Sequence, residues 1–414
     1  MKILILSWEY PPRTIGGLAR HVAGLSQALA KNEVDVNVVT VAENKHENAY
    51  QEKGVSVYTV PSYSLPFLNF ITDIQHLNFS LLEKSIKLIN DWGKIDIIHA
   101  HDWLVAYAAR ALKHIYRLPL ITTIHATEFG RNGGLYNELQ RYISSVEWWL
   151  TYESWKVIVC SKAMKQEVQY IFQTPGDKIE IINNGIELAD FNLPAKNIYE
   201  RNRYALPNEK IVFFIGRLVP EKGVQVLIEA IPKILQFEPK VKFIIAGKGP
   251  YENYLKHMVN TMGLENKVSF LGFIEDIERN ALYTYADCVV FPSIYEPFGI
   301  VALEGMAAGK PVVTSDTGGL GEIVEHGING LKCIPSNADS LAQQIIRVFS
   351  DPALVLKMVK KARVDVKEKY SWDGIARQTL SLYQQVINES KDTSWLPPWL
   401  TNNSNNKIIG RYEM

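Results

Sequence analysis

Short apolar runs alternate with longer stretches of helical periodicity along most of the chain. The runs are rich in valine and isoleucine and are bounded by polar or turn residues, which predicts β-strands. Several runs are apolar on both faces, as in strands of a sheet that is covered on both sides. In the first half we expect strands at residues 2–7, 34–41, 55–61, 95–99, 118–125, 157–160 and 179–182.

The pattern restarts near residue 211, with strands expected at 211–215, 241–246, 268–271, 288–291, 311–314 and 331–334. Helical periodicity predicts helices at 18–31, 67–89, 224–235, 251–261 and 372–387. Alternation of this kind predicts parallel sheets with crossover helices. Because each half opens with a strand, a glycine-containing loop and a helix, we predict an α/β protein with two doubly wound domains. Their ligands are expected in one central cleft, outside the carboxyl ends of the strands.

The segment 190–209 is polar and aperiodic and contains Pro194 and Pro207, so it is the expected linker. We therefore predict domains at 1–195 and 205–375. Residues 376–414 would form a final helix that returns toward the first domain, and a loose tail. Trp395 and Trp399 in this last part suggest that it docks somewhere on the protein.

Composition excludes several classes of protein. The 414 residues are 47% hydrophobic, and 44 basic residues balance 44 acidic ones, so nucleic acid is not expected as the principal partner. Three scattered cysteines form neither a disulfide framework nor a zinc cluster. No run reaches the roughly 18 apolar residues of a membrane span, and the first apolar run is too short for a signal peptide. We expect a soluble cytoplasmic protein without stable membrane insertion.

Two glutamates mark the second half. Glu296 follows the strand at 288–291 and lies in a loop, and Glu304 lies in the second turn of a helix that begins near Gly299. Seven residues span about two helical turns, so both carboxylates can lie on one side. Such a pair can hold sugar hydroxyls, since carboxylates are strong acceptors, or stabilise positive charge at an anomeric carbon. The alternative is a helix-start carboxylate with one solvated glutamate.

Arg217 and Lys222 lie in a loop between a strand and a helix start. A guanidinium, an ammonium and free backbone amides in such a loop suit a diphosphate. Two ordinary surface cations are the alternative interpretation.

Gly16 and Gly17 precede the first helix, where paired glycines let the backbone approach a ligand. Purely conformational glycines are the alternative. The third glycine of a dinucleotide fingerprint is missing, because Arg20 stands in its place. The loop at 247–250 fails the same test.

Histidines follow two strands of the first half. His99, His101 and Asp102 lie at the end of one strand, and His125 lies at the end of another. A single histidine there is usually structural, whereas two neighbouring strand ends point modestly to a site. The residue types permit a metal, but no spacing resembles a zinc pattern, and we predict none.

Together these motifs resemble the retaining glycosyltransferases of family four, which have the GT-B fold of two Rossmann-like domains. The resemblance runs to about Tyr383 and rests on Glu296, Glu304 and the segment 216–223. The first half also resembles glycogen and starch synthases, in residues 7–12, 16–18, 101–103 and 123–125. Phe298 and Glu304 depart from the bacterial glycogen synthase family proper. The mixture is most similar to α-glucosyltransferases of glycogen metabolism, such as maltose-1-phosphate synthases.

The resemblance implies retaining glucosyl transfer from ADP-glucose or UDP-glucose to an α-glucan or a glucose phosphate, without a cofactor. The first domain would face the acceptor and the second would bind the nucleotide sugar. Arg217 and Lys222 would bind the departing diphosphate, Glu296 the transferred sugar, and Glu304 the ribose. His125 would lie near the reacting face of the sugar, and Asp102 on the acceptor side. The resemblance also implies donor contacts from Gly16, Gly17, Gly216, Gly247, Gly249, Phe298, Gly299 and Ile300, and acceptor-side contacts from Glu9, Tyr10, His101 and Trp103.

Other functions stay open on the sequence alone. A family-four enzyme that builds a cell-surface or lipid-linked glycan is one, although the helix at 67–89 carries only Lys84 and Lys87 as basic residues and is a better core or cleft helix. A nucleotide-sugar epimerase of the same fold is another. A nicotinamide oxidoreductase is disfavoured, because the chain lacks the three-glycine fingerprint of that class. A noncatalytic sugar-binding protein is disfavoured too, because it would need no diphosphate loop. The oligomeric state is not implied.

Overall fold

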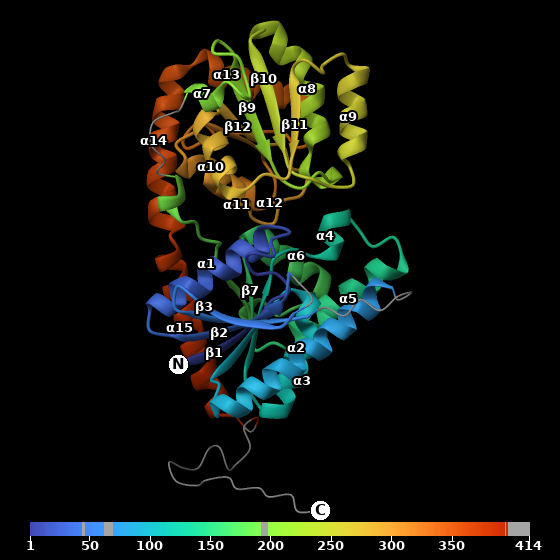
Figure 1. Cartoon of the computed structure of the whole chain (residues 1–414), viewed down its shortest axis with the longest axis vertical. Helices are drawn as coiled ribbons and strands as arrows, with labels where there is room; N and C mark the ends of the chain where they lie inside the picture. The colour runs from blue at the N-terminus through green and yellow to red at the C-terminus, as the bar shows by residue number, and fades with distance from the viewer. Residues whose placement is uncertain (44–45, 62–68, 192–197, 394, 396–414) are drawn as a thin grey trace, which may run out of the picture.

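The structure is a computed structural model that describes residues 1–43, 46–61, 69–191, 198–393 and 395 (Figure 1). In the described residues, the strands form two sheets, in the orders β3-β4-β2-β1-β5-β6-β7-β8 and β11-β10-β9-β12-β13-β14. All neighbouring strands run parallel except β3 and β4. Two doubly wound α/β units are therefore confirmed.

The first unit changes direction between β1 and β5, which lie side by side in the middle of its sheet. The loops that follow these two strands therefore open at the switch point where such sheets bind ligands. Its strands are β1 (Lys2–Leu6), β2 (Asp35–Val41), β3 (Asn48–Glu52), β4 (Val55–Val60), β5 (Ile97–His101), β6 (Leu120–Ile124), β7 (Lys156–Val159) and β8 (Ile179–Ile181). Its helices are α1 (Gly17–Lys31), α2 (Phe70–Trp92), α3 (Ala106–Tyr116), α4 (Glu128–Asn132), α5 (Glu138–Glu153) and α6 (Lys162–Phe172), with a 3₁₀ turn at η1 (Trp103–Val105).

The second unit has its switch point between β9 and β12, and the two predicted charged loops follow these strands. Its strands are β9 (Lys210–Ile215), β10 (Val241–Ala246), β11 (Val268–Gly272), β12 (Cys288–Phe291), β13 (Val312–Ser315) and β14 (Leu331–Cys333). Its helices are α7 (Ile198–Arg201), α8 (Val224–Phe237), α9 (Glu252–Thr261), α10 (Asp276–Tyr285), α11 (Ile300–Ala307), α12 (Gly318–Ile323), α13 (Ala338–Ser350) and α14 (Pro352–Lys369), with a 3₁₀ turn at η4 (Pro220–Lys222). The last helix, α15 (Trp372–Lys391), packs against the first unit.

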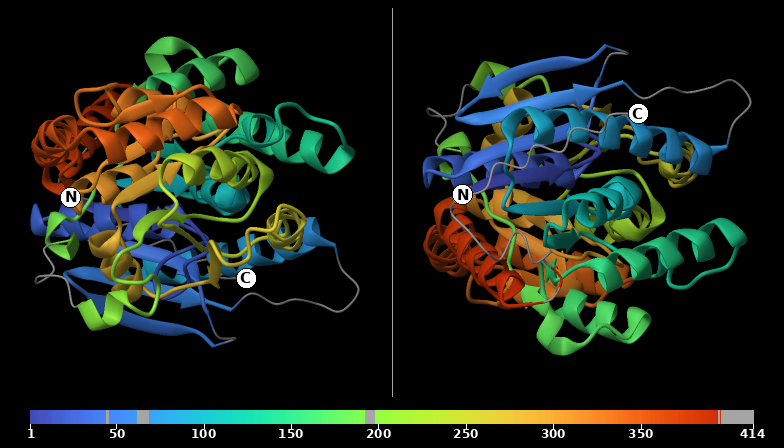
Figure 2. Two further views of the ribbon diagram at one scale, coloured as in Figure 1. Left: turned by 90° about the horizontal axis from the view of Figure 1, so that it is seen from above. Right: turned by 90° about the horizontal axis from the view of Figure 1, so that it is seen from below.

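The central strands of both sheets bury both faces, as their apolar runs predict. In β1, Leu4 and Leu6 enter one core, whereas Ile3 and Ile5 enter a second. Side chains of α1 and α15 complete this second core. Helices α14 and α15 follow one another down one side of the molecule, from the second unit to the first (Figures 1 and 2). The domain boundaries at 195, 205 and 375 stay predictions.

The structure adds to the predicted elements and shifts some of them. Strand β3 was not predicted, because it is a polar, largely exposed edge strand without apolar alternation. Strand β5 ends at His101 and not at residue 99. Helix α2 begins at Phe70, and residues 62–68 lie outside the described part of the chain. Its apolar side, with Ile74, Leu77 and Leu81, lies in the core, as expected of a core helix.

Trp395, one of the two tail tryptophans, packs against the first domain. It lies over the cations of Lys113 and Arg117, with distances of 4.9 and 5.1 Å to the ring centroid, and against His114. This part of the tail therefore docks on α3 and on Arg117, which follows it. Trp399 and the asparagine-rich segment lie outside the described residues. All three cysteines are buried and free.

Candidate active site

The loops that follow β9 and β12 pack against each other through their backbones. Gly223 has a φ of 71°, and a Cβ there would lie 1.9 Å from the carbonyl oxygen of Pro292. The amides of Ile294 and Tyr295 donate to the carbonyl of Glu221, at 2.8 and 3.3 Å. Only glycine combines this backbone conformation with such close approach. The 216–223 loop and the 292–299 loop therefore form one surface.

Lys222 and Glu296 meet on this surface. The Nζ of Lys222 lies 2.7 Å from Oε2 of Glu296, and the hydroxyl of Ser293 donates to the same oxygen at 3.3 Å. Glu296 is buried, with 8% of its surface exposed. Arg217 is half-exposed and pairs with Glu221 at 3.4 Å. Two cations and a buried carboxylate thus lie at the carboxyl edge of β9 and β12, where an anionic ligand with hydroxyl groups fits their chemistry.

Glu304 lies in the second turn of α11 and Glu296 lies in the loop before that helix, both as predicted. A spacing of two helical turns therefore does not describe the pair. The carboxylate of Glu304 has its own set of partners: Arg20 of α1 donates to Oε1 at 3.1 Å, and the hydroxyl of Tyr283 donates to Oε2 at 2.9 Å. The neighbouring Arg279 is also close, with its Nη1 3.7 Å from Oε1.

The start of α1 is shaped by Glu9. Its Oε2 accepts the amides of Ile15 and Gly16, at 2.9 and 3.0 Å. Burial raises the pKa of Glu9. The helix begins at Gly17, where a Cβ would lie 3.4 Å from Ile300 of α11. The amide of Gly16 is therefore already hydrogen-bonded within the protein. The turn at Gly16 and Gly17 also brings the start of α1 against α11 of the second domain.

Close backbone packing requires glycine at positions 247 and 249. A Cβ at Gly247 would lie 1.8 Å from the carbonyl oxygen of Gly216, and one at Gly249 would lie 2.1 Å from that of Leu218. The 247–250 loop and the start of the 216–223 loop thus touch through their backbones.

Four histidines gather where β5 and β6 end. Nδ1 of His101 lies 3.1 Å from Nε2 of His125, and the ring of His21, from α1, lies 4.6 Å from the ring of His125. His99 is hydrogen-bonded on both sides, at 2.6 Å to Tyr383 and 2.7 Å to Thr123. Burial lowers the pKa of all four, and that of His125 to about 3, with a further contribution from Arg131. The imidazoles are therefore neutral at pH 7.

Sequence reasoning missed His21. The signal was its place four residues after Gly17, because positions i and i+4 share one face of a helix. His21, His101 and His125 are the group that could hold a metal, since their ligating atoms lie within 4.8 Å of one another. Both nitrogens of His21 and Nε2 of His101 have no partner in the described residues. Zinc binds histidine nitrogen at about 2.0–2.1 Å, so these atoms would have to move closer together around an ion.

Asp102 holds the backbone of His125. Its Oδ1 accepts the amide of His125 at 2.8 Å, and its own amide donates to the carbonyl of Thr123 at 3.0 Å. Its φ is 60°, an uncommon conformation for a residue with a side chain. Burial raises the pKa of Asp102 to about 6. Asp102 therefore fixes the loop that carries His125.

Some predicted contact residues are packed inside. Tyr10 and Trp103 are only 1% and 4% exposed and lie in the two cores. Their side chains have almost no surface to offer an acceptor. Phe298 is likewise buried against Tyr370, so its donor-side contribution would have to come from its backbone.

The 292–299 loop touches the first domain at α6. The hydroxyl of Ser161 donates to the carbonyl of Pro297 at 2.7 Å, and the hydroxyl of Tyr295 donates to Glu167 at 2.8 Å. On the neighbouring α12, the carboxylate of Glu322 accepts the amides of Lys162 and Ala163, at 3.0 and 2.8 Å. The loop that carries Glu296 is therefore seated between the two domains.

Matches to known proteins cover both halves of the chain. Residues 15–190 match the model of "Glycosyltransferase Family 4", and residues 198–365 match that of "Glycosyl transferases group 1". An uncharacterized glycosyltransferase of Methanocaldococcus jannaschii is 44% identical over 390 residues, which cover 93% of this chain and 98% of the relative. The chain belongs to glycosyltransferase family 4. A glycogen synthase of Mycobacterium tuberculosis is 36% identical over 398 residues, which cover 92% of this chain and 94% of that protein.

Solved structures share the GT-B fold of this family-4 chain. A sucrose-phosphate synthase from Thermosynechococcus elongatus superposes with a TM-score of 0.82 at 24% identity, and covers 94% of this chain and 100% of its own. The Anabaena protein HepE in complex with UDP-glucose gives a TM-score of 0.75 at 24% identity, with 93% and 100% covered. The predicted fold of two Rossmann-like domains is thereby confirmed. Within the described residues, this family-4 chain contains no helix long and apolar enough to cross a membrane.

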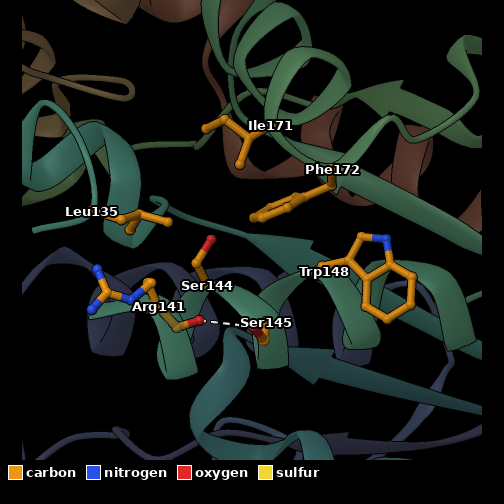
Figure 3. A pocket seen from close by; sticks show the side chains of 7 residues that line it. All are labelled: Leu135, Arg141, Ser144, Ser145, Trp148, Ile171 and Phe172. Carbon is orange, nitrogen blue, oxygen red and sulfur yellow. Dashed lines mark hydrogen bonds between the residues drawn. The ribbon is translucent and has the colours of Figure 1, made fainter. Parts of the chain in front are cut away.

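A cavity of about 290 Å³ lies apart from the predicted site residues of this family-4 chain. It opens between α5, α6 and the loop after α4 (Figure 3). Leu135, Ile171, Phe172 and the hydroxyl of Ser144 point into it (Figure 3). None of the residues that line this cavity belongs to the 216–223 loop or to the 292–299 loop.

Proposed function

We propose that this enzyme transfers a glucosyl unit from a nucleotide sugar, ADP-glucose or UDP-glucose, to an α-glucan or a glucose phosphate, with retention of configuration. The 36% identity to a glycogen synthase supports this assignment. The observation that carries it is the pairing of Lys222 with the buried Glu296, next to Arg217, at the carboxyl edge of β9 and β12. This edge offers cations for a diphosphate directly beside a carboxylate for sugar hydroxyls.

On the donor side, Arg217 and Lys222 would bind the diphosphate and stabilise its charge as it leaves. Both side chains are at least partly exposed, so a ligand can reach them. Glu296 would then accept from hydroxyls of the transferred sugar, and Glu304 from the ribose. We propose the same division of the chain as the sequence predicts, with the donor domain at 205–375.

On the acceptor side, the neutral imidazole of His125 is suited to a hydrogen bond with a sugar hydroxyl. Its pKa of about 3 argues against a role as a general acid at neutral pH. Asp102 would act by holding this histidine in place, through the bond to its amide.

Retention would come from reaction on a single face of the sugar. The bond between the anomeric carbon and the phosphate oxygen breaks, and that oxygen takes the proton of the acceptor hydroxyl. The acceptor oxygen then bonds to the same face of the anomeric carbon. In the described part of the chain, the hydrogen-bond partners of the Glu296 carboxylate are Lys222 and Ser293. The 292–299 loop carries no second acidic residue beside Glu296, which favours this route over a double displacement.

The test is a panel of ADP-glucose and UDP-glucose against glucose 1-phosphate and an oligoglucan, with the anomeric configuration of the nascent product read by NMR. We expect an α-linked product with at least one donor and acceptor pair. A β-linked product would refute retention. Stabilisation of the protein against heat by NAD alone, and by no nucleoside diphosphate or nucleotide sugar, would refute sugar transfer and favour an oxidoreductase.

A further inference from the structure

Arg20 reaches from the first domain into the second. It lies in the first turn of α1, and its Nη1 donates to Oε1 of Glu304 at 3.1 Å. Its Nη2 donates to Oδ1 of Asp276 at 2.9 Å. The two carboxylates belong to α11 and α10. One guanidinium thus ties α1 to two helices of the other domain.

Both oxygens of Glu304 already have donors. Oε1 accepts from Arg20 and lies 3.7 Å from Arg279, and Oε2 accepts the hydroxyl of Tyr283 at 2.9 Å. Only 4% of the side chain of Glu304 is exposed. Each oxygen can accept a further hydrogen bond, but the carboxylate is covered, so ribose hydroxyls can reach it only if one of these neighbouring groups moves aside.

Arg20 is the donor that can leave. Arg279 and Tyr283 are buried on α10, next to Glu304, and the single hydroxyl proton of Tyr283 is shared between Glu304 and the carbonyl of Val301. About a third of the side chain of Arg20 is exposed, and its second partner, Asp276, is 69% exposed. A displaced guanidinium can keep Asp276 or move into water, whereas displacement of Arg279 or Tyr283 would disrupt the core of the second domain.

We propose that Arg20 competes with the nucleotide for Glu304 and holds this carboxylate until a ribose with two free hydroxyls displaces it. The inference rests on the proposed function, in which Glu304 accepts from the ribose. A charged hydrogen bond is stronger than a neutral one, so a single hydroxyl replaces it poorly. Arg20 would thereby lower the affinity for ribonucleotides, and donor binding would release the contact between α1 and α11.

The test compares the wild type with Arg20→Gln by titration calorimetry, using ADP, UDP and their 2′,3′-dideoxy counterparts. We expect Arg20→Gln to bind the preferred ribonucleotide about 5- to 10-fold more tightly, as expected for loss of one competing ion pair. Binding of the dideoxy compound should not change, because it does not need Glu304. Asp276→Asn, which loosens Arg20 from its other side, should act in the same direction but more weakly. Arg110→Gln is the matched control, since Arg110 pairs with Glu153 within the first domain.

The possible failures are distinct. If Arg20→Gln and Asp276→Asn bind the ribonucleotide with unchanged or lower affinity, Arg20 does not compete and only this inference is overturned. If the ribose and dideoxy forms bind equally to the wild type and to Arg20→Gln, Glu304 is not the ribose acceptor, and that part of the proposed function fails with it. If neither ADP nor UDP binds either protein, the donor site itself is rejected.

Discussion

The Nζ of Lys222 lies 2.7 Å from Oε2 of Glu296, although 74 residues separate them in the chain. The contact follows from the order of the strands, because β9 and β12 are neighbours and each is followed by one of the two loops. The cation expected to bind a diphosphate and the carboxylate expected to bind a sugar therefore hold each other in place. A glycosyl donor has its diphosphate and its sugar joined by one bond, so it needs these two groups close together.

Lys222→Ala should lower kcat by about 10²- to 10³-fold, the usual cost of losing one group that stabilises charge in the transition state. The fold should persist, because Lys222 lies in a loop and is 21% exposed. Initial rates and thermal melting of the same preparation check both parts. Lys233→Ala is the control, since Lys233 pairs with Asp339 on the surface, and it should keep the wild-type rate. Wild-type turnover in Lys222→Ala would rule out the diphosphate role.

Gly223→Ala tests the backbone contact between the two loops. The new Cβ would lie 1.9 Å from the carbonyl of Pro292, so we expect a loss of about 2–5 kcal/mol in stability from overlap and strain together. Gly93→Ala separates the two causes. Gly93 also has a positive φ, of 76°, but its Cβ would meet nothing within 4 Å, so strain alone should cost about 1–2 kcal/mol. Urea unfolding measures both, and equal losses would show that the contact is unimportant.

Glu147→Gln tests a buried carboxyl beside the site. Both oxygens of Glu147 accept the amide of Glu128, at 2.9 and 3.1 Å, and so hold the start of α4. Burial raises the pKa of Glu147 to about 8. Between pH 4.5 and 8 the folded state therefore keeps a proton that the unfolded state loses, and this group lowers the free energy of unfolding as the pH rises.

Urea unfolding of Glu147→Gln and the wild type at pH 5, 6, 7 and 8 should show this effect in the difference between the two proteins. The variant should gain stability relative to the wild type as the pH rises, because glutamine does not titrate. The buried histidines act with the opposite sign, but they are the same in both proteins and cancel. Glu138→Gln on the same helix is exposed and should show no such trend. A constant difference between Glu147→Gln and the wild type would contradict the raised pKa.

The sequence predicted the strands well for a physical reason. A strand covered on both sides needs a continuous apolar run, and several of the expected strands have one. All thirteen expected strands lie where the structure has strands, with shifts of a few residues at their ends. Strand β3 does not need an apolar run, because it pairs only with β4 at the edge of the sheet and its side chains are mostly exposed. Edge strands of this type leave little trace in the pattern.

The site could be predicted only as far as single loops. Strand ends located Lys222, Glu296, Asp102 and His125 at one edge of each sheet, because that edge is set by parallel topology. Contacts between the domains left no local pattern: Arg20 and Glu304 are 284 residues apart. The burial of a side chain could not be predicted from the motifs either. Tyr10 was therefore predicted to contact the acceptor, although it is a core residue.

Glu322→Ala should loosen the closure of the two domains. Its carboxylate accepts the amides of Lys162 and Ala163 at the start of α6, where a carboxylate typically contributes about 0.5–2 kcal/mol. Without it, the contacts of Ser161 and Tyr295 and the ion pairs of Arg20 must hold the domains together, so we expect a larger radius of gyration for the ligand-free protein in small-angle X-ray scattering. Glu325→Ala is the control, because Glu325 is exposed two residues after α12. If both variants scatter like the wild type, Glu322 does not hold the domains together.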